Sequence, residues 1–138
     1  MAVTIADAIE FTRTNHRAVL ATRRRDGRPQ LSPVTVAPGP DGQVLISTRD
    51  TAMKVKNIER DPHVSLSVFT DAFFGAHVSL DGEASILRLP EAMEPLVEYY
   101  RSVSGEHPDW DDYRAVMARD RRVLLQITVT DAGPNAAG

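Results

Sequence analysis

The pattern of apolar and polar positions changes its period several times along the chain. Over residues 4–15 the apolar positions match one face of a helix, formed by Ile5, Ala8, Ile9 and Thr12. Short apolar or alternating runs predict strands at residues 18–22, 29–37, 43–48, 63–69, 76–80, 83–87 and 123–129. Among the turn signals between them, Asp26-Gly27 and Asp81-Gly82 are typical of tight hairpins.

Three further helices are predicted after the third strand and before the last one. Residues 51–60 have helical spacing, with Asp50 or Thr51 available as the cap and Asp61-Pro62 as the stop. Pro90 opens the next helix at a position that tolerates its missing N–H. Its apolar stripe is Met93, Leu96, Val97, Tyr100 and Val103. A short last helix carries Trp110, Tyr113 and Met117.

Hairpin connections dominate this order of elements, and they favour an antiparallel sheet that closes on itself to hide its edges. The sequence therefore predicts a mainly β fold with appended helices, built on a six- to seven-stranded antiparallel barrel. Pro33 interrupts the second strand, so we expect that strand to be at an edge or bulged there. We expect one domain over residues 1–130 and a frayed tail over residues 131–138.

The composition of the chain excludes several kinds of functional site. The 138 residues include no cysteine, which excludes a disulfide scaffold, a thiolate metal site and a cysteine nucleophile. The four histidines lack the spacing of metal ligands, so we expect no metal. Residues 1–60 hold ten Lys and Arg against six Asp and Glu, whereas the remainder holds six against thirteen. The acidic total argues against nucleic-acid binding, while the basic first half indicates either a local anion site or chance unevenness.

The strongest candidate for chemistry lies between residues 47 and 57, where a strand delivers hydroxyls and a cation to the start of a helix. Ser47, Thr48, Arg49 and Lys54 together with free backbone N–H groups form a reasonable phosphate cradle. The alternative is a capped helix whose basic side chains face water. The arginine-rich turn at residues 23–28 has the same two interpretations.

A second candidate contains adjacent aromatic residues in a loop. In an extended segment Phe73 and Phe74 cannot both point into one core, so one of them either walls a planar ligand or packs on the barrel end. His77 fits a structural hydrogen bond or a proton donor. Trp110 and Tyr113 fit helix-packing anchors better than a stacking platform.

The order of motifs resembles that of the split-barrel flavin and deazaflavin reductases, the pyridoxamine-phosphate-oxidase-like superfamily. Residues 54–62 are similar to its helix-to-strand signature K-x-(K/R)-N-(L/I)-x-R-D-P. Four other segments resemble the family in the same order: residues 19–34, 81–84, 105–114 and 121–125. The segment at 105–114 resembles the actinobacterial members that use coenzyme F420, the B-type flavin/deazaflavin oxidoreductases. The likeness spans residues 5 to 130.

This resemblance implies a homodimer with two cofactor sites at the subunit interface. It implies that Gln30 and Ser32 lie near the deazaflavin ring, and that Asn57 fixes the helix start. It implies that the phosphate and the start of the anionic tail are bound by Ser47, Thr48, Lys54 and Lys56. Arg49 would stand in for an arginine that some relatives carry at position 52. Phe74, Gly75 and His77 would come from the second subunit, with His77 as a candidate proton donor.

The resemblance therefore implies an enzyme that transfers a hydride from reduced coenzyme F420 to a planar conjugated acceptor such as a quinone, a tetrapyrrole or an enone. Two alternatives stay open: an FMN-dependent split-barrel oxidase or reductase, and a non-catalytic protein that binds F420, a flavin or haem. Because the chain has no secretory signal and no long apolar run, we expect a cytoplasmic protein without a membrane partner.

Overall fold

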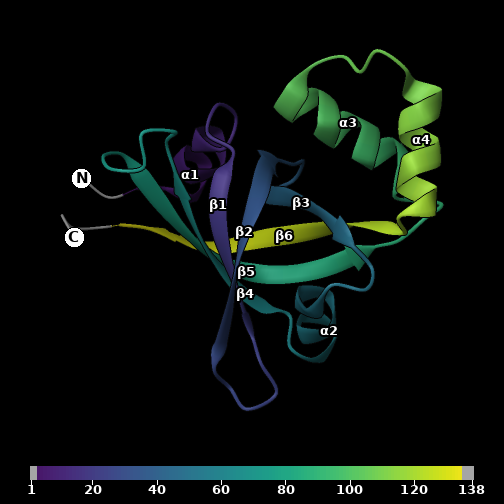
Figure 1. Ribbon diagram of the computed structural model, residues 1–138. Helices are drawn as coiled ribbons and strands as arrows, with labels where there is room; N and C mark the ends of the chain where they lie inside the picture. The colour runs from purple at the N-terminus through teal and green to yellow at the C-terminus, as the bar shows by residue number, and fades with distance from the viewer. Residues whose placement is uncertain (1–2, 135–138) are drawn as a thin grey trace.

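The computed structural model describes residues 3–134, and these form a closed barrel of six antiparallel strands with four helices outside it (Figure 1). The strands are β1 (Arg17–Arg23), β2 (Pro29–Pro38), β3 (Gln43–Arg49), β4 (His63–Phe69), β5 (His77–Leu87) and β6 (Arg122–Gly133). Their order around the barrel is β1-β2-β3-β6-β5-β4, and β4 pairs back with β1. The predicted mainly β, six- to seven-stranded antiparallel barrel is therefore confirmed, with six strands.

Alternation of side chains fills the barrel. Along β4 the apolar residues Val64, Leu66 and Val68 are buried, whereas the residues between them are exposed. The other strands contribute fully buried side chains to the same interior: Leu20, Val36, Ile46, Leu80, Leu125 and Ile127. Burial of one such side chain contributes about 1.5–3 kcal/mol, so this interior is the main source of the stability of the fold.

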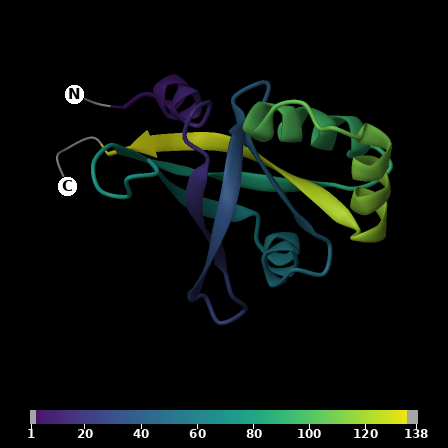
Figure 2. The ribbon, with the colours of Figure 1, turned by 45° about the horizontal axis from the view of Figure 1, so that its top comes forward.

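The helices are α1 (Ile5–Phe11), α2 (Met53–Arg60), α3 (Met93–Ser104) and α4 (Trp110–Arg119). Figure 2 shows α2 and the α3–α4 pair as separate bodies outside the barrel, while α1 lies near the two ends of the chain. Thr4 and Asp7 form a reciprocal capping box that begins α1. This helix ends at Phe11, earlier than the predicted limit at residue 15.

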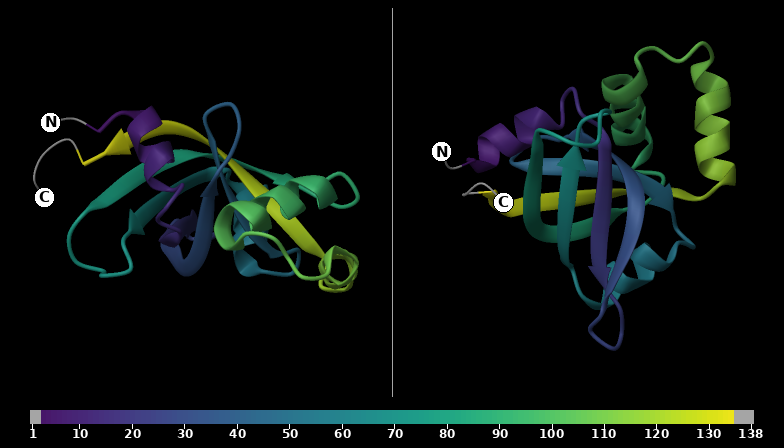
Figure 3. Two further views of the ribbon diagram at one scale, coloured as in Figure 1. Left: turned by 90° about the horizontal axis from the view of Figure 1, so that it is seen from above. Right: turned by 60° about the vertical axis from the view of Figure 1, so that its left-hand side comes forward.

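A second apolar core attaches α3 and α4 to the outside of the barrel. Leu96 and Val97 of α3 are buried against Leu45 of β3 and Leu124 of β6, and Met117 of α4 completes the cluster. Figure 3 shows both helices beside β6, on the outer surface of the sheet. This packing fixes the position of one wall of the cavity described below.

The predicted hairpin turn at Asp81-Gly82 is wrong, because β5 runs without a break from His77 to Leu87. The strand has a register shift between these two residues where it pairs with β6. Gly82 is buried, and a Cβ there would lie 2.3 Å from the backbone oxygen of Thr128. The glycine thus permits close approach of β6, a role of strand glycines that the local sequence does not separate from a turn.

Pro33 lies where β2 has one free edge, as predicted, and without a bulge. Pro33 pairs with Val19 of β1 in an unbroken register. On the other side β2 pairs with β3 only from Val36 onward, so no ladder partner is denied an N–H at Pro33. The sheet closes into a barrel through residues 36–38, but β2 and β3 are unpaired along the first half of β2, and this gap is the open side of the barrel.

Two other expectations need correction. The cap of α2 is Ala52, which has no side-chain hydrogen bond, because Asp50 is bound instead by Arg88 and Arg121. Residues 131–133, expected in a frayed tail, belong to β6, and Gly133 pairs with Ser79 of β5. Residues 135–138 of the predicted tail lie outside the described part of the chain.

Candidate functional site

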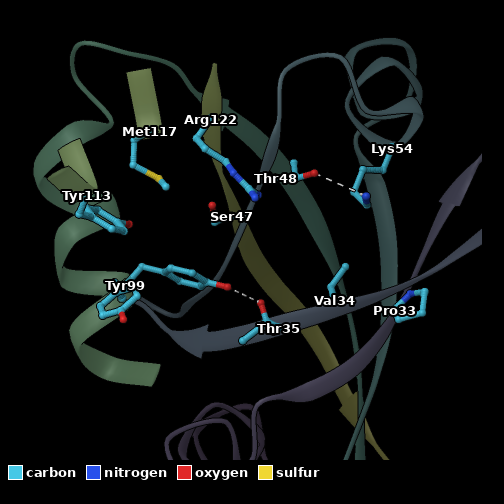
Figure 4. Close-up of a pocket in the computed structure, with 11 residues that line it drawn as sticks. Pro33, Val34, Thr35, Ser47, Thr48, Lys54, Tyr99, Tyr113, Met117 and Arg122 are labelled. Atoms are coloured by element: carbon cyan, nitrogen blue, oxygen red, sulfur yellow. Dashed lines mark hydrogen bonds between the residues drawn. The ribbon is translucent and has the colours of Figure 1, made fainter. Parts of the chain in front are cut away.

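A cavity of about 630 Å³, here called the main cavity, lies between the α3–α4 pair, α2 and the open side of the barrel (Figure 4). Its lining comes from six elements, namely β2, β3, α2, α3, α4 and β6. The lining residues are Pro33, Val34, Thr35, Ser47, Thr48, Lys54, Tyr99, Tyr100, Tyr113, Met117 and Arg122. Of the predicted cofactor residues, Ser47, Thr48 and Lys54 are thus brought together here.

Two cations face the main cavity, and no lining residue is a carboxylate. Lys54 of α2 donates a long hydrogen bond of 3.5 Å to Oγ1 of Thr48. Burial, and next to it the charge of Arg122, lowers the pKa of Lys54. Nε of Arg122 is buried without a hydrogen-bond partner among the described residues. Positive charges held together without a counter-charge attract an anion.

The side of the cavity away from Lys54 is aromatic. Tyr99 donates its hydroxyl hydrogen to the carbonyl oxygen of Thr35 at 2.8 Å, and Tyr113 donates to that of Leu96 at 2.9 Å. Burial raises the pKa of Tyr99 to about 12, and also that of Tyr113 to about 12. Both phenols are neutral at physiological pH. Their hydroxyls are engaged within the protein, so the two side chains provide a flat, largely apolar wall.

The local sequence explains the polar side of the cavity. Ser47 and Thr48 stand near the end of β3, and a short turn leads from there to α2. Because Ala52 supplies no side-chain cap, the first backbone N–H groups of α2 are available to a ligand. Lys54 follows in the first helical turn, on the side of Thr48.

A second cavity of about 530 Å³, here called the hairpin cavity, lies between the β1–β2 turn and the other side of α2. It contains the predicted residues Gln30, Lys56 and Asn57, and it is basic. Its lining is Arg24, Arg25, Gln30, Met53, Lys56, Asn57 and Arg60. The predicted site residues are therefore divided between two cavities on either side of α2.

Asn57 acts mainly as a structural link. Its buried amide nitrogen donates to Thr22 at 3.0 Å and to Gln30 at 2.7 Å, while its oxygen accepts from Arg60 at 3.2 Å. The residue thus ties the second turn of α2 to β1 and β2, rather than fixing the helix start. Because Oε1 of Gln30 is bound by Asn57, the amide nitrogen of Gln30 is the group that can face a ligand.

Ser32 and Arg49, two of the residues predicted for the cofactor, line neither cavity. Ser32 is half-buried on β2, on the same face of the strand as Gln30 and Val34, and so lies between the two cavities. Arg49 is exposed and pairs with Asp120 at 3.7 Å. Asp120 caps α4, and this acidic partner directs Arg49 away from the main cavity.

The predicted group from residues 73–77 is distant from both cavities within one chain. Phe74 is 83% exposed and meets Phe73 edge-to-face, with ring centroids 4.9 Å apart. Gly75 has a φ of +117°, which only glycine adopts readily. His77 is exposed at the start of β5, with Nδ1 3.4 Å from the Gly75 carbonyl oxygen. Their contribution from a second subunit stays a prediction.

Sequence reasoning missed Arg122, Tyr99 and Met117 as members of the site. Arg122 comes from the start of β6, within the last of the family-like motifs at residues 121–125, which was the available signal. Tyr113 was predicted as a packing anchor, and its ring centroid lies 5.5 Å from that of Trp110. It is therefore both an anchor and part of the cavity wall.

Within residues 3–134, no three His, Cys, Asp or Glu side chains are grouped so that they could hold a metal ion. No helix in this part of the chain is long and apolar enough to cross a membrane.

The family model described as pyridoxamine 5′-phosphate oxidase matches residues 6–134, nearly the whole chain. The chain belongs to the pyridoxamine 5′-phosphate oxidase family. The predicted superfamily is thereby confirmed. The closed six-stranded barrel described above is consistent with the split barrel of this family.

Solved structures give the same fold. A conserved hypothetical protein of Mycobacterium tuberculosis is 24% identical with a TM-score of 0.75, covering 98% of this chain and 91% of its own. A structure described as an F420 reductase is 19% identical with a TM-score of 0.70, over 90% and 94% of the two chains. A FAD-binding protein of Mesorhizobium loti is 20% identical with a TM-score of 0.67, over 96% and 94%.

Proposed function

We propose that this member of the pyridoxamine 5′-phosphate oxidase family is an oxidoreductase that transfers a hydride from reduced coenzyme F420 to a planar conjugated acceptor. The observation that carries the proposal is the main cavity, where Lys54 and Arg122 face a space without any lining carboxylate. A ligand with a permanent negative charge compensates these cations, and F420 carries a phosphate and an acidic tail. The likeness to an F420 reductase supports this choice.

The donor set suits the phosphate of such a cofactor. Hydroxyls from Ser47 and Thr48, the ammonium of Lys54 and the N–H groups at the start of α2 are the groups that bind phosphate in proteins. On the other side of α2, Lys56 and the arginines of the hairpin cavity would hold the acidic tail. Gln30 of the hairpin cavity and Ser32, which lies between the two cavities, would contact the ring.

The cofactor supplies the hydride, so the protein contributes binding, orientation and the exclusion of water. We propose a homodimer in which Phe74, Gly75 and His77 of one subunit cover the site of the other. The exposure of Leu31 at 64%, Phe73 at 62% and Phe74 at 83% supports such an association. His77 would hold the proton that accompanies the hydride.

A titration of F420 fluorescence, with FMN in a parallel titration, tests the cofactor. We expect micromolar binding of F420, weaker by about tenfold or more in Lys54→Ala, or about 1.4 kcal/mol. The matched control is Arg13→Ala, because Arg13 is exposed, lines neither cavity and pairs with Glu10. Equal binding to wild type and Lys54→Ala would remove Lys54 from the site.

Subunit mixing tests the shared site. If Lys54 and Phe74 serve one site from two subunits, Lys54→Ala and Phe74→Ala should each turn over slowly at a subsaturating F420 concentration, and random mixing should raise turnover to about a quarter of the wild-type value. No recovery after co-refolding of the two variants would place all the residues of a site in one chain.

A flavin is the second candidate, favoured by the likeness to a FAD-binding protein. The same hydroxyls and Lys54 would hold its phosphate. Tighter binding of FMN than F420 in the titration above would select it. Binding of either cofactor without turnover of any quinone acceptor would instead indicate a carrier.

A further inference from the structure

Arg122 stands apart from the other polar side chains of the described chain. Nε of Arg122 is the only buried side-chain nitrogen or oxygen in residues 3–134 that lacks a hydrogen-bond partner. Its neighbour Arg121 binds Asp50, and Arg114 of α4 binds Glu94. Buried polar groups in proteins are nearly always paired, and the side chain that carries this unpaired group lines the main cavity, which indicates a ligand there.

The surroundings of Arg122 differ from those of Lys54. Lys54 lies by the hydroxyl of Thr48, the setting of a phosphate. In Figure 4 the guanidinium of Arg122 extends into the space between Thr48 and the side chains of Tyr99, Tyr113 and Met117. The charge of Arg122 therefore borders an apolar, flat surface, because both tyrosine hydroxyls are engaged elsewhere.

These features assign a ligand with two parts. Aromatic rings and a thioether favour a planar, polarizable body. A guanidinium in the cavity lining favours a carboxylate, whose two oxygens match its planar fork. The lining contains no carboxylate that could compete for it.

We propose that this end of the main cavity is the acceptor subsite, and that it selects planar aromatic or conjugated acids by pairing their carboxylate with Arg122. The proposal rests on the proposed function and narrows it, because it names the substrate class. The cofactor phosphate belongs to the Lys54 end, and the acidic acceptor belongs to the Arg122 end.

Trp110 provides a readout that needs no cofactor and no turnover. It is the only tryptophan of the chain, and its ring centroid lies 5.5 Å from that of Tyr113 in the cavity wall. Titration of the purified protein with anthraquinone-2-carboxylate and with anthraquinone-2-carboxamide compares two flat ligands that differ in charge. We expect the carboxylate to quench Trp110 at a concentration lower by about tenfold or more, as for a hydrogen bond to a charged group.

Variants assign that preference to one side chain. Arg122→Gln should lose the preference and bind the carboxamide as wild type does, and Arg122→Lys should regain part of it. Arg119→Gln removes an exposed arginine of α4 that pairs with Asp120, and it should keep the full preference. Thermal unfolding of each variant separates a loss of binding from a loss of fold.

Three results would overturn the proposal. Equal affinity of wild type for the two anthraquinones would show that the subsite ignores charge. A preference that survives in Arg122→Gln would assign it to another group. Arg122→Gln could instead weaken F420 binding as much as Lys54→Ala does and keep the carboxylate preference. That result would assign Arg122 to cofactor binding. A carboxylate preference without any F420 binding would instead refute the proposed cofactor and keep the subsite.

Discussion

The side-chain amide nitrogen of Asn57 donates a 2.7 Å hydrogen bond to Oε1 of Gln30, and this bond joins α2 to β2. The same nitrogen donates to Thr22 of β1 at 3.0 Å. One buried side chain therefore links the helix that carries Lys54 to the strand that contributes residues to both cavities. Residues that contact a ligand therefore depend on Asn57 for their position, although Asn57 itself need not contact the ligand.

Replacement of Asn57 by alanine should destabilise the fold and loosen the site. The Thr22 and Gln30 side chains would lose their partner in a buried environment, at a cost of about 1–3 kcal/mol. Urea unfolding measures the free-energy change, and cofactor titration measures the effect on binding. Lys56→Ala, exposed and adjacent on α2, should change stability by no more than about 0.5 kcal/mol. Equal stability of the two variants would contradict the linking role.

Anion binding in the main cavity should weaken at alkaline pH earlier than an ordinary lysine would allow. Burial and Arg122 lower the pKa of Lys54 below 10.5, so its positive charge is lost at a lower pH. Sulfate keeps a constant charge over this range, which makes it the suitable probe. Calorimetric titration of sulfate between neutral pH and the ordinary lysine pKa should give a steadily rising Kd.

The matched variants for this pH dependence are Lys54→Arg and Lys56→Arg. Arginine stays charged throughout the range, so Lys54→Arg should flatten the profile. Lys56 lines the other cavity, and its replacement should leave the profile as in wild type. A steep profile that persists in Lys54→Arg would exclude Lys54 as the titrating group.

The protein should lose stability in strong alkali through its two buried phenols. Each has a folded pKa of about 12 against an ordinary value of 10.0, so folding favours the protonated form. The contribution of these two tyrosines to the free energy of unfolding is complete below pH 10 and is lost as the pH rises through about 12. Denaturant unfolding at a series of pH values measures the free energy of unfolding. Above pH 10 this free energy should fall less steeply in the Tyr99→Phe, Tyr113→Phe double variant than in wild type. Equal slopes of unfolding free energy against pH in wild type and in the double variant would contradict the raised pKa values.

Gly82→Ala should be strongly destabilising although it adds one methyl group. Its Cβ would meet the Thr128 backbone oxygen, which cannot rotate away as a side chain would. We expect a loss of about 1–3 kcal/mol or more from this overpacking. The comparison is Ser79→Ala, at an exposed position of the same strand, and the measurement is the shift in Tm. A Tm unchanged by Gly82→Ala would mean that the two strands separate easily.

The strands and helices were largely predictable because their signals are local. The alternation of β4 and the apolar stripe of α3 follow directly from the geometry of strands and helices. The continuous strand through Asp81-Gly82 was not predictable, because a glycine needed for close approach of a distant strand has the same local context as a turn glycine. Only the pairing of β5 with β6 distinguishes the two roles.

The same division applies to the site. Ser47, Thr48 and Lys54 lie within one strand-turn-helix segment, so the sequence alone predicted them as an anion cradle. Lys56 and Asn57 lie in that segment too, but helical geometry turns them to the opposite side of α2, into another cavity. Arg122 and Tyr99 reach the cradle only because β6 pairs with β3 and α3 packs on the outside of both.

By itself the sequence determined the class of the fold, the elements and one basic, hydroxyl-rich segment, since each depends on the spacing of neighbouring residues. The tertiary structure decided which groups face one another. Closure of the barrel brought Arg122 beside the cradle of Lys54, buried its Nε without a partner and set an aromatic wall next to it. Such a charge indicates a ligand only when it is buried, and its burial results from the folding of the chain and not from the local sequence pattern.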